Sequence, residues 1–240
     1  MRIIEVEDYE KMSKAGAEML AQVIKDNPCA TLGLATGTTP IGAYKLLIEK
    51  NKSGKISFKN IRTVNLDEYV GLKGDNVHSY RYFMNNELFD RVDIDKNNTY
   101  IPSGASEALE MECKKYDEII EKYPRDIQLL GIGSDGHIGF NEPGSSFEER
   151  THVVELAVST IFDNARLFKR IEDVPVRAVT MGIADIMKAK SILVMANGKN
   201  KAEALRNMIN GEVSESCPAS ILRLHKNVTV IADKDATYLL

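Results

Sequence analysis

Short apolar runs rich in β-branched residues alternate with longer stretches of helical periodicity along the chain, and this alternation constrains the fold most strongly. It predicts right-handed crossovers and an α/β fold, with a mostly parallel sheet covered by helices on both faces. We expect strands at residues 2–6, 30–35, 61–66, 126–132, 176–181, 191–196 and 228–232. The helices are expected at residues 8–26, 40–51, 79–88, 105–122, 160–169 and 200–210.

The sequence predicts a single Rossmann-like domain over residues 1–240, with a small β-insertion near residues 145–158. No Pro/Gly/Ser linker, internal repeat or low-complexity tract divides the chain, and 240 residues are enough for one well-buried core. The first helix is expected to begin after Asp8 as its N-cap. Its buried side is expected to carry Met12, Ala15, Met19, Leu20 and Val23.

Charge and cysteine content exclude several classes of protein. A formal net charge of −4 offers no basic surface to nucleic acid or anionic lipid, so any bound phosphate must be held locally. The three cysteines are odd in number and widely spaced, which favours reduced thiols over disulfides or a zinc site. The N-terminus has no signal-peptide pattern, and no apolar run approaches the about 18 residues of a membrane span. We therefore expect a cytoplasmic protein with no nucleic-acid or membrane partner.

Ligands of parallel sheets bind where the carboxyl ends of the strands collect their loops. Four predicted strands are followed by polar or glycine-rich loops: TGTTP after 30–35, DEYVG after 61–66, GSDGHIGFNEP after 126–132 and NGKNK after 191–196. If the sheet is correct, these loops converge on one edge and form a site.

Two of the loops suit an oxyanion such as a phosphate monoester. In TGTTP, Gly37 allows a sharp turn, and backbone N–H groups with the hydroxyls of Thr38 and Thr39 offer donors. In NGKNK, Lys199 and Lys201 stand at a predicted helix start, where a bound anion would relieve their conflict with the helix dipole. An ordinary helix cap and solvated lysines are the alternative interpretations. The P-loop spacing and its lysine are absent.

Adjacent carboxylates follow the strand at 61–66. One of Asp67 and Glu68 is expected to enter the cleft while the other faces away, because successive side chains of an extended chain alternate. A carboxylate in the cleft could act as a general base, and a turn or helix cap is the alternative.

The stretch LGIGSDGHIGFNEP, residues 130–143, contains G-x-G-x-x-G but does not predict a dinucleotide site. The third glycine, Gly136, is followed by two more glycines, an asparagine and a proline, so no helix can begin there. The loop instead gathers Asp135, His137, Asn141 and Glu142. An imidazole beside carboxylates suits acid–base catalysis. A divalent metal site and a purely structural histidine are the competing interpretations, although a typical zinc spacing is missing.

Five sequence blocks follow one another along the chain: LATGTTPIGAY, TVNLDEYVGL, HSYRYFMNNELFD, LLGIGSDGHIGFNEPGSSFEERT and SCPASILRLH. With these blocks the chain resembles the glucosamine-6-phosphate deaminase family from end to end, and G-x-G-x-D-G-H-x-x-F-N-E-P is highly specific. The resemblance implies a Rossmann-like sheet and glucosamine 6-phosphate as substrate. The products would be ammonia and fructose 6-phosphate, and no cofactor or metal is implied.

By matched position, the resemblance implies that Asp67 is the base that moves the C2 proton toward C1, and that His137 opens the pyranose ring. Asp135 and Glu142 would orient and tune the imidazole. The phosphate would lie on Gly37, Thr38, Thr39, Arg166 and Lys201. Residues 156–175 are expected to form a mobile lid that carries Arg166.

The chain departs from the regulated bacterial members of that family, which are longer at the C-terminus. Those members carry basic residues just after the N-E-P-G-S-S segment, where this chain has His152 and Val154. We therefore expect hyperbolic kinetics without an N-acetylated sugar phosphate activator, and a monomer or small homo-oligomer. The preference at C4, glucosamine or galactosamine 6-phosphate, stays open.

Two rival functions are considered. A 6-phosphogluconolactonase shares a G-x-D-G-H block, but that family has serine, leucine and phenylalanine before the next proline, whereas this chain has FNEP with Glu142. A non-enzymatic sugar-phosphate sensor would normally come with a DNA-binding helix-turn-helix, for which the chain has no spare residues.

Overall fold

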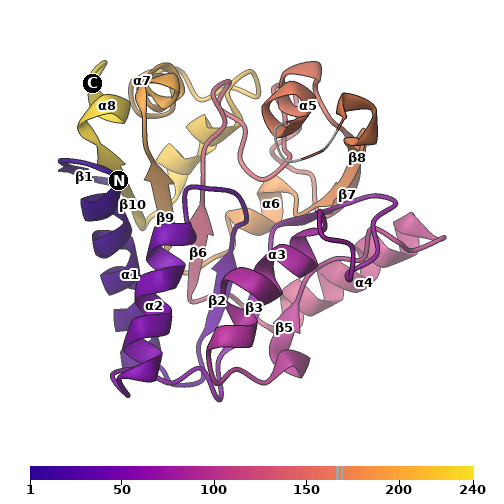
Figure 1. Cartoon of the computed structure of the whole chain (residues 1–240). Coiled ribbons are helices and arrows are strands. Elements are labelled where there is room, and N and C mark those ends of the chain that lie inside the picture. Colours follow the sequence, from indigo (N-terminus) through magenta and orange to yellow (C-terminus); the bar gives the residue numbers. More distant parts are fainter. Residues whose placement is uncertain (166–167, 169) are drawn as a thin grey trace.

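The main sheet of the computed structural model is fully parallel, as the alternation predicts (Figure 1). The structure describes residues 1–165, 168 and 170–240. Among them, seven strands pair in the order β1-β10-β9-β6-β2-β3-β5. Their bounds are β1 Arg2–Val6, β10 Val228–Asp233, β9 Ile192–Ala196, β6 Ile127–Leu130, β2 Thr31–Leu34, β3 Arg62–Asn65 and β5 Thr99–Tyr100. The expected Rossmann-like α/β architecture is confirmed.

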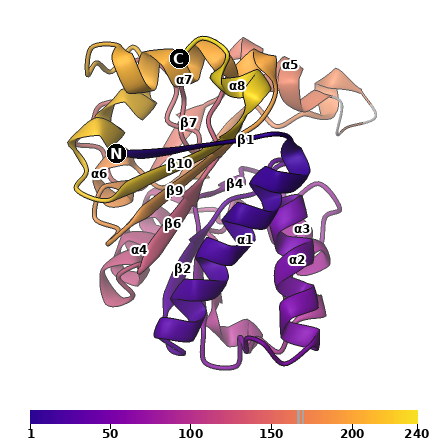
Figure 2. The ribbon, with the colours of Figure 1, turned by 90° about the vertical axis from the view of Figure 1, so that its left-hand side faces the viewer.

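Helices cover both faces of this sheet (Figure 2). On one side lie α1 Tyr9–Asp26, α2 Ile41–Lys52 and α3 Tyr80–Glu87, and on the other lie α4 Leu109–Lys122 and α6 Ile183–Ile186. Near the carboxyl ends of the strands are α5 Val158–Ala165, α7 Ala202–Asn210 and α8 Lys234–Thr237. The 3₁₀ turns are η1 Phe89–Arg91, η2 Lys96–Asn98, η3 Ile171–Asp173, η4 Lys199–Lys201 and η5 Pro218–Leu224. Within the described part of the chain, no helix is both long and apolar enough to span a bilayer.

Helix α1 begins as expected but turns a different side to the core. The Asp8 carboxylate caps it by accepting a hydrogen bond from Lys11 N at 2.8 Å. Met12 and Leu20 are fully buried, but the expected Ala15, Met19 and Val23 are only partly so. The buried positions include small residues such as Gly16, where a Cβ would lie 2.6 Å from Met195 Sδ on β9. Close approach to the sheet thus selects small side chains, which counting large apolar residues overlooks.

One predicted strand leaves the main sheet, and this corrects the sequence-based topology. Residues 176–181 were expected in the parallel sheet, but β8, Arg177–Thr180, pairs antiparallel with β4, Asp67–Tyr69, and with β7, His152–Glu155. The order in this second sheet is β4-β8-β7. The expected β-insertion near 145–158 is therefore present as β7. The pairing of β4 with β8 places Asp67 opposite Thr180 and so fixes the start of β4.

Most predicted helices are confirmed with shifted ends. The helix expected at 105–122 begins only at Leu109, and the one expected at 200–210 starts as η4 before α7. The helix expected at 160–169 corresponds to α5, Val158–Ala165. Residues 166, 167 and 169 of that prediction lie outside the described part of the chain.

The order of the main sheet reverses between β2 and β6, which lie side by side. From β2 the chain proceeds to β3 and then β5 on one side, and it later enters β6 on the other side. At such a reversal the loops that leave two neighbouring strands diverge and open a crevice at the carboxyl edge. The loops after β2 and β6 are TGTTP and GSDGHIGFNEP, so the topology brings two of the predicted loops to one place.

Candidate active site

A two-part cleft opens at this reversal of strand order. Its inner pocket, of about 120 Å³, is lined by residues that include Thr36, Gly37, Asp67, Tyr80, His137 and Phe140. These come from the loop after β2, from β4, from α3 and from the loop after β6. Three of the four loops that were expected to converge therefore meet in this pocket.

An outer pocket of about 560 Å³ adjoins the inner one, because Thr36, Gly37 and Gly131 line both. It is further lined by Thr38, Thr39, Phe162, Asn197, Asn200 and Lys201. The NGKNK loop after β9 therefore joins the other loops, through Lys201 but not Lys199. The two volumes differ in character: the inner one holds acid–base groups, while the outer one holds hydroxyls, amides and a lysine.

The two adjacent carboxylates after β3 face opposite ways, as expected. Asp67 lines the inner pocket and is only 6% exposed. Burial raises the pKa of Asp67 to about 8, and the neighbouring Glu68 carboxylate acts in the same direction. A carboxyl whose pKa lies near neutral pH is well matched to proton abstraction.

Glu68 points away from the pocket and anchors α3. Its Oε1 accepts hydrogen bonds from Tyr69 N at 2.9 Å and Tyr80 N at 2.8 Å, and its Oε2 accepts one from Arg81 N at 2.9 Å. A carboxylate at the start of a helix satisfies otherwise unpaired N–H groups and suits the helix dipole. The pair Asp67–Glu68 therefore divides its roles between the cleft and the scaffold.

Tyr80 is a pocket residue that the sequence did not single out. Its ring lies 4.8 Å from that of Tyr69 and stacks on Phe140 at 5.9 Å, and its hydroxyl donates to Tyr69 Oη at 3.3 Å. Burial raises the pKa of Tyr80 well above its usual value, so the hydroxyl keeps its proton at neutral pH. Its position in HSYRYF, just after the Ser79 N-cap, does not predict a place in the cleft. The start of this helix reaches the cleft only through its hydrogen bonds to Glu68, and these depend on the tertiary structure.

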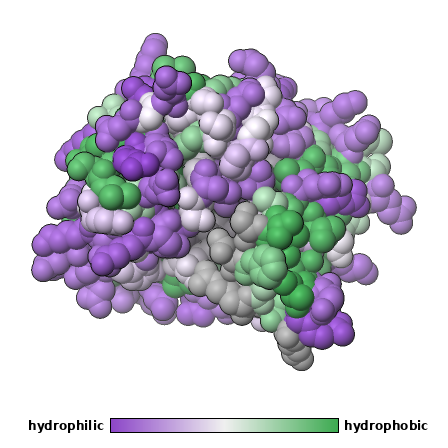
Figure 3. Space-filling view, turned by 90° about the horizontal axis from the view of Figure 1, so that it is seen from above, coloured by the Kyte–Doolittle hydropathy of each residue, from purple (hydrophilic) through white to green (hydrophobic). Residues whose placement is uncertain are grey.

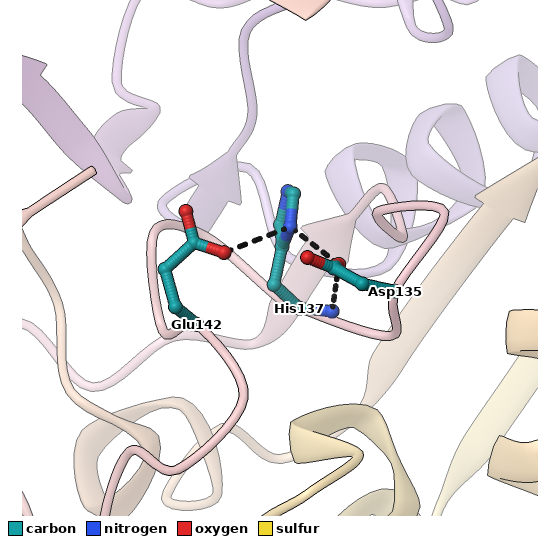
Figure 4. Close-up of side chains that lie close together, drawn as sticks. All are labelled: Asp135, His137 and Glu142. Carbon is teal, nitrogen blue, oxygen red and sulfur yellow. Dashed lines mark hydrogen bonds and ion pairs between the residues drawn. The ribbon is translucent and has the colours of Figure 1, made fainter. Parts of the chain in front are cut away.

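His137 lies between two carboxylates of its own loop (Figure 4). Its Nδ1 is 2.8 Å from Asp135 Oδ1 and 3.5 Å from Glu142 Oε2. Asp135 Oδ1 also accepts a hydrogen bond from His137 N at 3.1 Å. Burial opposes the ionisation of Asp135, but contact with the imidazole outweighs it and lowers the pKa of Asp135 to about 2. Carboxylates at Nδ1 hold a proton there and leave Nε2 to exchange protons in the cleft.

The same three residues offer ligand atoms within 4.8 Å of one another, a spacing that a divalent cation could use. The surrounding donors suit a proton-transfer triad better. Glu142 Oε1 already accepts from Thr160 Oγ1 at 2.6 Å and from Ala157 N at 3.3 Å. Only Oε2 of Glu142 is turned toward the imidazole. The structure also agrees with the rejection of a dinucleotide site, since no helix begins in the described stretch 136–143.

The predicted phosphate residues lie in the outer part of the cleft, with one exception. Gly37 has φ +93°, a backbone conformation that lets the loop after β2 turn back toward α2. Thr39 Oγ1 donates to Asn197 Oδ1 at 3.2 Å, which joins the TGTTP and NGKNK loops. Arg166 lies outside the described residues.

The rim of the cleft is partly apolar. Seen from above the carboxyl ends of the strands, the surface is mostly hydrophilic, but hydrophobic side chains gather on one part of it (Figure 3). On α5, Val158 and Phe162 are 68% and 63% exposed, and Phe162 lines the outer pocket. Sequence reasoning missed Thr36, Phe162, Asn197 and Asn200, since none of them carries a charge or a titratable group.

Comparison with known proteins agrees with this geometry. A family model described as glucosamine-6-phosphate isomerases/6-phosphogluconolactonase matches residues 7–231. A glucosamine-6-phosphate deaminase of Thermoanaerobacter sp. (strain X514) is 52% identical over 241 residues, covering 100% of this chain and 95% of the relative. Glucosamine-6-phosphate deaminase 1 of Bacillus subtilis (strain 168) is 48% identical over 240 residues, covering 100% and 99%.

Solved structures give the same result. The structure of a monomeric glucosamine-6-phosphate deaminase superposes with a TM-score of 0.98 at 48% identity, with 100% of both chains covered. A 6-phosphogluconolactonase from Trypanosoma brucei gives 0.80 at 21% identity over 100% of this chain and 98% of the other, which shows a common fold only. The chain therefore belongs to the family of glucosamine-6-phosphate isomerases and 6-phosphogluconolactonases, and within it to the glucosamine-6-phosphate deaminases.

Proposed function

We propose that the chain converts glucosamine 6-phosphate and water into fructose 6-phosphate and ammonia. The observation that carries this proposal is the pairing of Asp67 and His137 across one small pocket. Next to it lies an outer pocket with the hydroxyls of Thr38 and Thr39 and the Lys201 ammonium. An aminosugar phosphate needs both parts: acid–base groups at C1 and C2, and a polar cradle for the phosphate.

The reaction begins with ring opening. The C2 proton of the closed hemiacetal is weakly acidic, and opening the ring creates the C1 carbonyl that makes this proton removable. We assign the ring-opening proton transfer to Nε2 of His137. Asp135 and Glu142 hold its other nitrogen. These carboxylates orient and tune the imidazole and do not themselves react.

Isomerisation follows through Asp67. The carboxylate takes the C2 proton, and the electron pair moves toward C1 to give an enolamine. Return of a proton to C1 produces the C2 imine, which water hydrolyses to the ketone with loss of ammonia. The raised pKa of Asp67 suits both the removal and the return of a proton near neutral pH.

The remaining assignments extend this proposal. Gly37, Thr38, Thr39 and Lys201, together with Arg166, would bind the phosphate. The expected lid at 156–175 includes residues 166, 167 and 169, which lie outside the described part of the chain. Residues 1–240 would act as a single domain and as a monomer or small homo-oligomer in the cytoplasm. A deacetylase acting on N-acetylglucosamine 6-phosphate would supply the substrate, which places the chain in N-acetylglucosamine catabolism. The chemistry draws only on side chains of the protein.

Ammonia release from glucosamine 6-phosphate tests the proposal. The parent chain should turn over, and Asp67→Asn and His137→Asn should each lower kcat at least about 100-fold, the usual contribution of a positioned acid or base. Asp75→Asn, an exposed carboxylate outside the cleft, is the matched control and should retain parent activity. Galactosamine 6-phosphate in the same assay reports the preference at C4.

A negative result has a clear meaning. If the folded parent releases no ammonia but hydrolyses 6-phosphogluconolactone, the site is correct and the reaction is wrong. If it binds sugar phosphates without turning either over, the sensor interpretation replaces the enzyme.

A further inference from the structure

Glu142 connects the catalytic loop to α5 through its two separate oxygens. Its Oε2 faces His137 Nδ1 at 3.5 Å, while Oε1 accepts hydrogen bonds from Thr160 Oγ1 at 2.6 Å and Ala157 N at 3.3 Å. Glu142 and Thr160 are 8% and 5% exposed, so water does not readily substitute for these partners. The short contact with Thr160 is the strongest constraint on the Glu142 carboxylate among these partners.

We propose that Thr160 is a positioning residue of the reaction: its hydroxyl fixes Glu142 in the orientation that serves His137. The inference rests on the proposed function and deepens it, because it makes α5 part of the acid–base machinery. The catalytic cluster is then complete only when residues 157–160 are docked against the loop after β6.

The two carboxylates at Nδ1 have different tasks. Asp135, at 2.8 Å, is close enough to hold the Nδ1 proton by itself. Glu142, at 3.5 Å, holds the same nitrogen from a second side, so two carboxylates fix the orientation of the ring. The other titratable groups that share the pocket with the ring are Asp67 on β4 and Tyr80 on α3, which lie across the cleft. If Glu142 loses Thr160 and turns away, the ring should therefore be held less firmly in the orientation that turns Nε2 toward the cleft.

Thr160→Val is the informative variant, since it removes the hydroxyl and nearly preserves the side-chain volume. Thr160→Ser is its matched control, because it keeps the hydroxyl and loses only a methyl group. The first readout is the separation of kcat from KM with glucosamine 6-phosphate. The second is the set of NMR chemical shifts of the histidine ring protons at one fixed pH, which is tractable because the chain has only four histidines. The resonances of the other three rings also report whether each variant is folded.

We expect Thr160→Val to lower kcat about tenfold, the order of one hydrogen bond to a charged group, with KM changed less than about threefold. The ring resonances of His137 should shift in the same variant, and Thr160→Ser should match the parent in both readouts. Parent values of kcat and of the His137 resonances in Thr160→Val would overturn the proposal. So would a higher KM with kcat and the His137 resonances unchanged, which would make Thr160 only an anchor of α5.

The two proposals can fail separately. If the parent releases no ammonia, the proposed function fails, but the His137 ring resonances still report the connection from Thr160 through Glu142 to His137. If the parent is active and these resonances and kcat are the same in all three proteins, only the inference about Thr160 fails.

Discussion

Asp67 and Glu68 are chemically almost the same group at adjacent positions, and the fold makes them different. Burial raises the pKa of both, but Glu68 accepts three backbone N–H donors whereas Asp67 lines the cleft. Alternation along an extended chain was enough to predict this division from the sequence. Which of the two enters the cleft depends on the pairing of β4 with β8, and the residues alone do not reveal it.

The raised pKa of Asp67 predicts a pH-dependent stability that Asp67→Asn should remove. The carboxyl ionises near pH 4 in the unfolded chain and at about 8 in the folded one. Between these values folding takes up a proton, so the free energy of unfolding falls as the pH rises, by up to about 1.4 kcal/mol per pH unit. The stabilising contribution of protonated Asp67 is complete below pH 4 and is lost as the pH rises through about 8.

Urea unfolding at pH 5 and pH 8 checks this expectation. Asp67→Asn should gain stability relative to the parent at pH 8 and much less at pH 5, even though it loses activity. Asp75→Asn should follow the parent at both values. Equal differences between Asp67→Asn and the parent at the two pH values would mean that Asp67 titrates as an ordinary carboxyl.

At the scale of elements, the sequence located most helices and strands but not every pairing partner. Apolar periodicity predicted β2, β3 and β6 because all three are buried on both faces of the parallel sheet. A similar apolar run forms β8, but β8 belongs to the second sheet. The local sequence pattern identifies a strand and does not identify the distant strand with which it pairs. Strands of two or three residues, such as β5 and β4, are too short to show any period.

The candidate site shows the same limit. Asp135, His137, Glu142 and one of Asp67 and Glu68 were predicted because ionisable residues follow strands at the edge where ligands bind, and the family resemblance then selected Asp67. Tyr80 and Thr160 lie on helices, and each reaches the site only through a carboxylate from another segment, Glu68 or Glu142. Such contacts depend on tertiary packing, which a single sequence does not supply.

On helix α6, away from the cleft, we expect the substitution of Asp185 to lower stability strongly. Asp185 is fully buried and accepts hydrogen bonds from Arg150 Nε at 3.3 Å and Lys188 Nζ at 2.9 Å. Burial lowers the pKa of Arg125 to about 10, and this guanidinium donates to the backbone carbonyl of Asp185. Asp185→Asn should cost about 3 kcal/mol in the free energy of unfolding, because removing its charge leaves the buried Arg125 guanidinium uncompensated.

Denaturant unfolding at neutral pH measures this cost, and kcat should stay within about threefold of the parent. The matched control is Asp90→Asn, which breaks the exposed ion pair with Lys96 and should cost less than about 1 kcal/mol. Equal losses in the two variants would show that Asp185 contributes no more than a surface pair.

For the whole molecule, one fold serves two chemistries, and the loops decide between them. This chain and the lactonase from Trypanosoma brucei share the architecture at 21% identity, so the sheet alone does not distinguish deamination from lactone hydrolysis. In this chain the reversal of strand order provides the crevice. We expect the FNEP segment with Glu142, and its connection to α5, to specify the reaction proposed here.

The last prediction concerns regulation of the whole chain. The expected lack of an activator depends on His152 and Val154, and His152 is already engaged: its Nδ1 contacts the Arg150 carbonyl oxygen at 2.8 Å. Its Nε2 lies 3.6 Å from a Glu149 carboxylate oxygen, and Val154 packs against the apolar cluster around Tyr69. An anionic activator would therefore find a carboxylate and an apolar side chain there in place of cations.

Saturation with glucosamine 6-phosphate should accordingly be hyperbolic, with a Hill coefficient of about 1, the value for independent sites. Adding N-acetylglucosamine 6-phosphate should leave the shape of the curve unchanged, and sedimentation of the same sample reports its oligomeric state. A sigmoidal curve that this compound makes hyperbolic would place an activator site on the chain despite His152 and Val154. The activator would then have to bind through residues other than these two, because both nitrogens of the His152 ring already face oxygen atoms and Val154 carries no charge.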